Sequence, residues 1–323
     1  MFEHKRLFSL INAANIQSGL LKKNFVQSAN DFKRYEDISL GIPILVPADN
    51  ELFSFKRSDV FQIHEDFLLS TIYSHSDASY VGFKHSFTGT HFLSSFSVKD
   101  DFKDKFNRLV EHNLATIAHV RAVGKNQKKI GAFQTRNIPH FGHEEIIWRM
   151  LTKCEHLVVN PVIGPKKRGD VTVECLSLVF SEYFAKKYSN KISFNPIFAN
   201  MFYAGPREAI HHAHMRKTIG CNLFSVGRDH AGAEEKYPIQ AASILAKSLE
   251  KIIDIEIMCH QGAVFCNGCG KVILEGDCTH SNSEKKDISG TEFRTNIKNG
   301  TIYELADKGL QKFLHRKVSK VFE

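Results

Sequence analysis

Apolar runs and amphipathic stretches alternate along residues 128–260, and this alternation predicts a regular α/β unit. Each short apolar run reads as a strand, and the stretch after it carries apolar residues at helical spacing, as at Ile146, Ile147, Met150 and Leu151. The expected strands are residues 130–133, 157–159, 192–194, 223–226 and 253–258, and the expected helices are residues 144–154, 176–184, 205–217 and 239–249. Four strand–helix repeats with a closing strand predict a parallel sheet covered by helices on both faces. Ligands of such sheets bind at the carboxyl ends of the strands.

The segments on either side of this unit have less regular patterns. Residues 1–125 contain short apolar runs broken by Gly, Pro, Asn and Ser, such as IPILV at residues 42–46 before a polar turn, and they predict a mostly β domain with a few helices. Residues 261–323 are irregular and end in a basic helix over residues 310–321. We therefore expect three regions, with boundaries at residues 1–125, 126–260 and 261–323.

The composition is that of an ordinary globular protein. The chain has 323 residues, 42% of them hydrophobic and 24% charged, and this length suits two or three domains. No apolar run is long enough to span a membrane, and the first residues lack the features of a secretory signal. Four of the seven cysteines stand singly in apolar stretches (Cys154, Cys175, Cys221 and Cys259), which is typical of reduced thiols in the cytoplasm. We expect a soluble cytoplasmic protein.

The formal net charge is +8, which is compatible with three interpretations. A lysine-rich surface is the simplest. An active site for small polyanions and a nucleic-acid-binding surface are the alternatives. The lysines are scattered in pairs along the chain and form no single block, which favours a small anionic substrate over a nucleic acid.

The segment QTRNIPHFGHE, residues 134–144, leaves the first expected strand and opens the next helix. His140 and His143 are three residues apart, so they lie on one face of the first helical turn. Free backbone N–H groups and the helix dipole favour phosphate there, and imidazoles can donate hydrogen bonds to phosphate oxygens. Arg136 adds a planar fork that can grip a tetrahedral oxyanion. An isolated H-x-x-H more often caps a helix or binds a metal, but its place after a strand and beside Q-x-R-N favours phosphate.

A second segment, GRDHAG at residues 227–232, follows the strand expected at residues 223–226 and so lies at the same edge of the sheet. Gly227 permits a close approach of the backbone to a ligand. Arg228 can stabilise charge on a phosphoryl group, and His230 is a further donor. Asp229 is a structural acceptor in this interpretation. An ordinary turn is an equally weighted alternative for this hexapeptide alone.

A third segment, YAGPRE at residues 203–208, stands at the start of another expected helix, with Pro206 suited to its first turn. Arg207 has two possible roles: its side chain faces the site, or it pairs with Glu208. We favour structural support as its role.

Cysteines gather near the carboxyl end of the chain. Cys266 and Cys269 are spaced as in a zinc knuckle, and Cys278 with His280 completes four ligands for tetrahedral zinc. Four protein ligands leave no open position, so such a zinc is structural. The short Cys-x-His spacing leaves the fourth ligand open, with His260 as a substitute. A redox Cys-x-x-Cys is the alternative, and the third cysteine argues against it.

Taken in order, these motifs resemble the ATP sulfurylase (sulfate adenylyltransferase) family. The resemblance covers about residues 130–300 and rests on FQTRNIPHFGHE at 133–144, NPVIGPKKRGDV at 160–171, YAGPREA at 203–209, VGRDHAG at 226–232 and ISGTEFR at 288–294. FCNGCG with CTH resembles the zinc-bearing insertion of some bacterial members. The resemblance implies a Rossmann-like nucleotidyltransferase domain, residues 126–260, after a shortened N-terminal PUA-like domain and before a small zinc-containing region.

The resemblance also implies a reaction, its partners and its residues. AMP passes from ATP, accompanied by Mg²⁺, to sulfate, giving adenosine 5′-phosphosulfate and pyrophosphate; no nucleic acid or membrane takes part, and a homo-oligomer is expected. Sulfate is assigned to Gln134, Arg136 and the backbone of Ala231. The nucleotide is assigned to Gln134, Asn137, His140, His143, Gly227, Arg228, Asp229 and His230. Catalytic roles are assigned to Thr135, Arg136, Asn137, His140, His143 and Arg228.

Departures from the family pattern keep two rival functions in view. The front of the chain is shorter than the family's, and Phe141-Gly142 stands where the family commonly has Arg-Ala. These changes leave room for adenylyl transfer to a different oxyanion or metabolite. A basic zinc-containing nucleic-acid-binding protein is the rival outside enzymes, and the chain lacks the aromatic and basic interleaving of single-strand binders.

Overall fold

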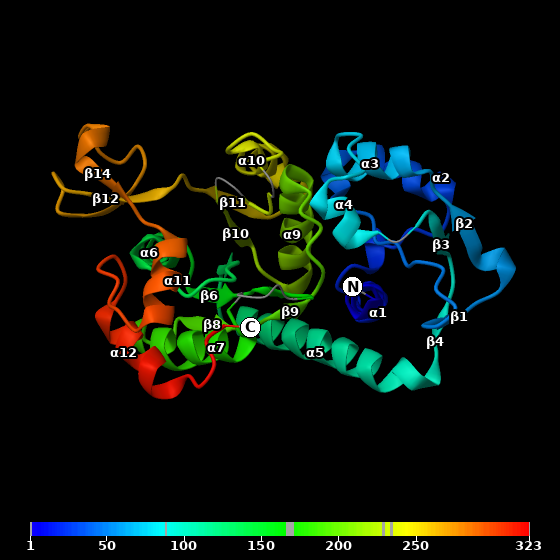
Figure 1. Ribbon diagram of the computed structural model, residues 1–323, viewed down its shortest axis with the longest axis horizontal. Coiled ribbons are helices and arrows are strands. Elements are labelled where there is room, and N and C mark those ends of the chain that lie inside the picture. Colours follow the sequence, from blue (N-terminus) through cyan, green and yellow to red (C-terminus); the bar gives the residue numbers. More distant parts are fainter. Residues whose placement is uncertain (1, 88, 166–170, 228–229, 233–234, 323) are drawn as a thin grey trace.

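A parallel sheet lies at the centre of the computed structural model, which describes residues 2–322 except residues 88, 166–170, 228–229 and 233–234. Among the described residues it has five strands in the order β11-β10-β5-β6-β8, and every neighbouring pair is parallel (Figure 1). The strands are β5 (Ile130–Phe133), β6 (His156–Val159), β8 (Ile192–Phe194), β10 (Leu223–Val226) and β11 (Glu256–Cys259). The predicted parallel sheet is confirmed. β11 begins later than expected because the preceding helix continues to Ile253 and ends at Asp254, whose φ of 58° is left-handed.

Helices cover both faces of the sheet, because successive residues of its strands are mostly apolar and buried. Ala132, Val158 and Phe224 face a core shared with α9 (Gly205–Ile219) and α10 (Ala241–Ile253). Phe133 and Val159 face the opposite core. That second core is shared with α6 (Phe141–Leu151), α7 (Val173–Leu178) and the π-helical turn η5 (Val179–Phe184), which continues into α8 (Ala185–Lys187).

The N-terminal region is largely helical, so the expectation of a mostly β domain is wrong. It contains α1 (Phe2–Gln17), α2 (Ala29–Phe32), α3 (Glu65–Tyr73), α4 (Val81–Ser86) and the long α5 (Asp100–Gly124). Its described strands have only two or three residues: β1 (Phe53–Ser54) with β4 (Ser97–Val98), and β2 (Val60–Gln62) with β3 (His91–Leu93). The apolar run at residues 42–46 is buried but forms only an isolated bridge at Ile44, because Pro43 has no N–H to donate to a ladder.

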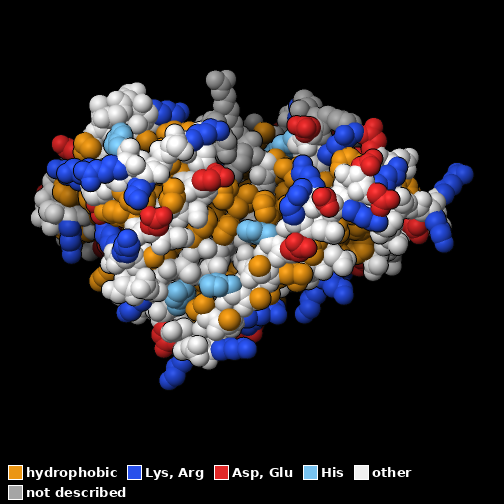
Figure 2. Space-filling model, turned by 90° about the horizontal axis from the view of Figure 1, so that it is seen from below, with side chains coloured by type: hydrophobic (Ala, Val, Ile, Leu, Met, Phe, Trp, Pro, Cys, Tyr) orange, Lys and Arg blue, Asp and Glu red, His pale blue; other side chains and the backbone are white. Residues whose placement is uncertain are grey.

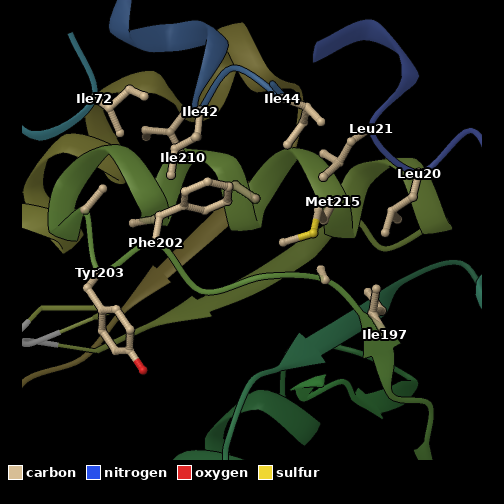
Figure 3. Packing of buried hydrophobic residues seen from close by; sticks show 14 of the residues in the cluster. Leu20, Leu21, Ile42, Ile44, Ile72, Ile197, Phe202, Tyr203, Ile210 and Met215 are labelled. Carbon is tan, nitrogen blue, oxygen red and sulfur yellow. The ribbon is translucent and has the colours of Figure 1, made fainter. Parts of the chain in front are cut away.

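The N-terminal region packs directly against α9, beside the central sheet. Figure 3 shows Ile42, Ile44 and Ile72 lying against α9, on which Ile210 and Met215 are also buried. The ring of Tyr203, from the segment before α9, points away from that helix. The expected boundary at residue 125 thus follows the end of a helix, while the apolar core continues across it. The division into domains stays a prediction.

The carboxyl-terminal residues form a small sheet and two helices. β12 (Ala263–Cys266) pairs antiparallel with β13 (Lys271–Leu274) and β14 (Lys285–Asp287), and these strands lie at one end of the molecule (Figure 1). α11 (Gly290–Asn299) and α12 (Lys308–Lys317) follow, and Phe293, Leu310 and Leu314 join the core of α6 and α7. No helix among the described residues is long and apolar enough to cross a membrane.

Candidate active site

A cavity of about 280 Å³ opens at the carboxyl ends of β5 and β10, where the sequence predicts the site. It brings together seven of the predicted residues from two distant segments: Gln134, Thr135, Arg136, Asn137, His143, His230 and Ala231. Nearly ninety residues separate these segments in the chain, and the parallel pairing of β5 with β10 places them side by side. The convergence at this edge therefore follows from the sheet topology.

The first wall of the cavity is the turn after β5. The Thr135 hydroxyl accepts a hydrogen bond from the Asn137 N–H at 3.1 Å and lies 3.2 Å from the Asn137 carbonyl, to which it donates. This local ring fixes the path of the chain and leaves the Arg136 side chain exposed, with no hydrogen bond or ion pair among the described residues. Gln134 Oε1 is buried without a partner among them. The turn therefore presents an unengaged cation and an unengaged amide to a ligand.

The second wall is the start of α6, where both histidines are held by the backbone. His140 Nδ1 accepts from the Gly142 N–H at 3.1 Å, His143 Nδ1 lies 3.5 Å from the His140 N–H, and the two ring centroids are 4.0 Å apart. Burial lowers the pKa of His140 to about 4 and holds the pKa of His143 well below its usual range. Both rings are therefore neutral at neutral pH. Because Nδ1 accepts, we assign the ring proton to Nε2, which makes each histidine an uncharged donor.

The two histidines differ in where they face. His143 lines the cavity, and His140 does not. The His140 ring lies beside Gly290 at the start of α11 instead. Contact of His140 with a ligand therefore requires that the ligand extends from the cavity toward α11.

The third wall is the turn after β10. His230, Ala231 and Gly232 line the cavity, while Gly227 lies beside His260 rather than on the cavity wall. Arg228 and Asp229 lie outside the described residues. Ala231 has a φ of 56°, a left-handed conformation that costs a non-glycine residue about 1 kcal/mol or more and is often found at functional sites.

Four lining residues were not predicted as site residues: Val162, Met201, Tyr203 and Gly232. Tyr203 belongs to the YAGPRE segment, so this motif could have indicated it as a site residue. Its φ of 59° is also left-handed, and Glu208 holds this turn by accepting from the N–H groups of Phe202 and Ala204 at 2.8 and 2.9 Å. Arg207 donates to the Gly41 carbonyl at 2.9 Å and faces the N-terminal region, in keeping with structural support.

A second layer of histidines lies behind the cavity. His212 Nδ1 is 2.8 Å from His230 Nε2, and His212 Nε2 is 3.5 Å from Glu208 Oε1. Burial raises the pKa of Glu208 to about 7 and lowers that of His230 to about 3. The spacing of Glu208 and His212, one helical turn apart, was the available sequence signal for this contact.

The cysteine cluster has the geometry of a metal site. Ligand atoms of Cys266, Cys269, Cys278 and His280 all lie within 4.8 Å of one another. The Sγ atoms of Cys266 and Cys278 are 3.8 Å apart, and His280 Nδ1 is 3.5 and 3.3 Å from the Sγ atoms of Cys266 and Cys269. Tetrahedral zinc with Zn–S bonds of about 2.3 Å requires S···S distances of about 3.8 Å, which these match. His260 instead lies 2.9 Å from the Ser225 hydroxyl, so His280 rather than His260 belongs to the cluster.

Comparisons with known proteins show which family the chain resembles. A sequence profile described as ATP-sulfurylase matches residues 115–304. The sulfate adenylyltransferase of Staphylothermus marinus is 28% identical over 325 residues, covering 92% of this chain and 84% of the relative. That of Thermococcus onnurineus is 40% identical over 180 residues, covering 54% of this chain and 46% of the relative.

A solved structure shares the fold. The hexameric APS kinase from Thiobacillus denitrificans aligns with a TM-score of 0.61 at 14% identity, covering 97% of this chain. This chain spans 62% of that one. At 14% identity the likeness concerns only the arrangement of the elements. The profile match covers more than half of the residues, including every segment that lines the cavity, and the chain therefore belongs to the ATP-sulfurylase family.

Proposed function

We propose that this protein is a sulfate adenylyltransferase that transfers AMP from ATP to sulfate. The observation that carries the proposal is the single cavity in which the turn after β5, the first turn of α6 and the turn after β10 meet. The products are adenosine 5′-phosphosulfate and pyrophosphate. Mg²⁺ enters with ATP as part of the substrate.

The chemistry needs positioning and charge stabilisation rather than a general base. Sulfate is fully ionised, so one of its oxygens attacks the α-phosphorus directly, forming an S–O–P link while the bond to the β-phosphate oxygen breaks. Repulsion between two anions is the main obstacle. The cavity answers it with Arg136 and with neutral donors such as His143, and its described wall contains no carboxylate.

We assign roles within the cavity from these properties. Gln134 and Arg136 hold sulfate, with the backbone of Ala231 closing the pocket. Thr135 and Asn137 fix the turn that presents Arg136. His143 and His140 follow the triphosphate toward the leaving pyrophosphate, and Gly227 to His230 hold the nucleotide with Arg228 on the α-phosphate.

The decisive experiment replaces Arg136. Arg136→Ala should abolish pyrophosphate release from ATP and sulfate, because loss of one oxyanion contact costs about 3–4 kcal/mol, or a factor of about 10² to 10³. Arg57→Ala is the matched control, since Arg57 is an exposed arginine in the N-terminal region. A folded Arg136→Ala variant with near-normal release would refute the site assignment.

A different acceptor is the second candidate, and one structural observation favours testing it. The Phe141 side chain is apolar and packs against the core that α6 shares with the sheet, and its N–H donates to the Leu305 carbonyl at 2.9 Å, so this position offers no charge to a substrate. Pyrophosphate release measured with sulfate, selenate, molybdate and phosphonates separates the two functions. Preference for an acceptor other than sulfate would favour the second.

Two further assignments accompany the proposal. A structural zinc bound by Cys266, Cys269, Cys278 and His280 is supported by their tetrahedral distances, and the sequence motif agrees. Assembly into a homo-oligomer is supported by exposed isoleucines on and before α10, with Ile239 72%, Ile244 65% and Ile252 67% exposed. Figure 2 shows Lys and Arg side chains dispersed among acidic and apolar ones, which gives no support to nucleic-acid binding on that face.

A further inference from the structure

Three titratable side chains contact one another in sequence from α9 to the cavity. Glu208 and His212 are fully buried, and His230 lines the cavity. His212 stands between them, with Nδ1 2.8 Å from His230 Nε2 and Nε2 3.5 Å from Glu208 Oε1. His212 Nε2 has no hydrogen-bond partner among the described residues. Glu208 Oε1, at 3.5 Å, is the acceptor in position to take its hydrogen bond. The transfer chemistry described above uses neither Glu208 nor His212.

The protons on this chain are constrained by its geometry. Burial holds the pKa of His212 and of His230 far below the usual range, so each ring is neutral and carries one proton. At a separation of 2.8 Å one ring must donate and the other accept. The position of the proton on His230 therefore depends on the position of the proton on His212.

Two arrangements satisfy this constraint. When Glu208 is ionised, His212 directs its Nε2–H at the carboxylate, its Nδ1 accepts from His230, and His230 Nδ1 is left bare. When Glu208 is protonated, its hydrogen points at His212 Nε2, His212 donates from Nδ1, and His230 carries its proton on Nδ1. The second arrangement holds one proton more than the first. Only the second gives His230 a free N–H for an anion in the cavity.

We propose that the Glu208–His212–His230 chain couples the binding of an oxyanion in the cavity to the uptake of one proton from solvent. The inference rests on the proposed function, because it takes the cavity to hold the sulfuryl or phosphoryl oxyanion. The proton taken up resides on Glu208 Oε1 and returns to solvent when the anion leaves. Glu208 and His212 are thus positioning residues that set the donor state of His230.

The surroundings place this equilibrium near neutral pH. Burial raises the pKa of Glu208 to about 7, against the lowering effect of the N–H groups of Phe202 and Ala204. The other titratable or charged groups that act on the three members come from several elements: Arg136, Tyr73, Tyr237, His211, Arg216 and His260. Arg136 lowers the pKa of Glu208 and so opposes its protonation in the free protein, while Arg216 lowers the pKa of His212 and His230. An anion beside Arg136 offsets that opposition, which favours proton uptake on binding.

The test variant is His212→Asn. An asparagine amide reaches the position of the imidazole Nδ1, so it can still bond to His230 Nε2, but it stops short of Glu208. The matched control is His211→Asn, because His211 is the adjacent residue of α9, is equally buried and has no hydrogen-bond partner on either ring nitrogen among the described residues. The probe is adenosine 5′-phosphosulfate, which has no group that titrates near neutral pH.

Isothermal titration at about pH 8, in two buffers of different ionisation enthalpy, counts the protons taken up on binding. We expect about one proton for the wild type and for His211→Asn, and close to none for His212→Asn. The wild-type Kd should also weaken by up to about tenfold per pH unit above the pKa of Glu208, while that of His212→Asn stays nearly constant.

Three results would overturn the inference: wild-type binding without proton uptake, unchanged uptake in His212→Asn, or equal loss in both variants. The wild-type measurement decides even if His212→Asn fails to fold. If the wild type does not bind adenosine 5′-phosphosulfate at all, the proposed function fails and the inference fails with it. Binding without proton uptake overturns the inference alone.

Discussion

At the scale of single residues, different side chains of the cavity supply positive charge and uncharged hydrogen-bond donors. His143 can donate a hydrogen bond without being charged, because its Nδ1 is turned toward a backbone N–H and burial keeps the ring neutral. The fixed positive charge on the described cavity wall comes from Arg136, which is exposed and unengaged. Substitution of His143 and of Arg136 should therefore affect different steps, with Arg136 bearing most on the dianionic acceptor.

Gly268 is a residue at which one carbon atom decides whether the Cys/His cluster can form. A Cβ at this position would lie 2.6 Å from ring atoms of His280. Gly268→Ala should therefore push His280 out of the cluster and reduce retained zinc from about one per chain to a small fraction. Metal analysis after gel filtration measures the content.

Gly89→Ala is the control for this prediction, because a Cβ there meets nothing within 4 Å. Equal zinc in Gly268→Ala and the wild type would show that His280 is not a ligand. A wild type purified without zinc, and unable to take it up, would remove the assignment altogether.

At the scale of elements, one lysine joins three helices. Lys187 Nζ, in α8, lies 2.5 Å from a carboxylate oxygen of Glu144 in α6 and 2.5 Å from one of Asp307, which caps α12. Glu144 is buried, and burial raises its pKa, while the ammonium of Lys187 lowers it. These two contacts therefore hold α12 to α6 and α8.

Lys187→Met should destabilise the protein by about 1–3 kcal/mol, since it leaves a buried carboxylate without its cation and Lys187 itself is partly exposed. Urea unfolding measures the change. Lys187→Met combined with Glu144→Gln should recover part of the loss. A double variant no more stable than the single one would show that the carboxylate is not the source of the penalty.

The predictable elements and the unpredictable ones differ in how they are buried. The five strands of the sheet are mostly apolar, so their positions could be predicted from the sequence, and the site turns followed from the ends of those strands. α5 could not, because its buried face includes Asn113 and Thr116. Asn113 is buried by donating to Asn15 Oδ1 and to the Phe198 carbonyl, each at 2.9 Å. The contact of His212 with Glu208 could not be predicted for the same reason. A hydropathy pattern predicts polar residues to be exposed, although polar groups that contact one another can be buried.

At the scale of the whole molecule, buried neutral histidines make stability depend on pH. Burial lowers the pKa most strongly for six of them: His140, His143, His211, His212, His230 and His260. Each binds its proton more readily in the unfolded chain. Stability is therefore fully present above the ordinary histidine pKa and is lost as pH falls below about 6.5.

We expect the free energy of unfolding to fall between about pH 7 and pH 5, by up to about 1.4 kcal/mol per pH unit for each histidine that stays neutral when folded. Glu208 acts in the opposite direction in this window, because its raised pKa favours the protonated folded form. Urea titrations at several pH values give the slope. His211→Asn should reduce the slope by about one proton, and a pH-independent stability would contradict the burial of these rings.

The shared core of the N-terminal region and α9 has a consequence for how this family can be recombined. Ile42, Ile44 and Ile72 are in the same apolar cluster as Ile210, which lies one turn after Pro206 on the helix that begins beside the cavity. A chimera joined at residue 125 would place a foreign surface against that helix. The N-terminal region therefore cannot be exchanged for a foreign one without matching changes on α9.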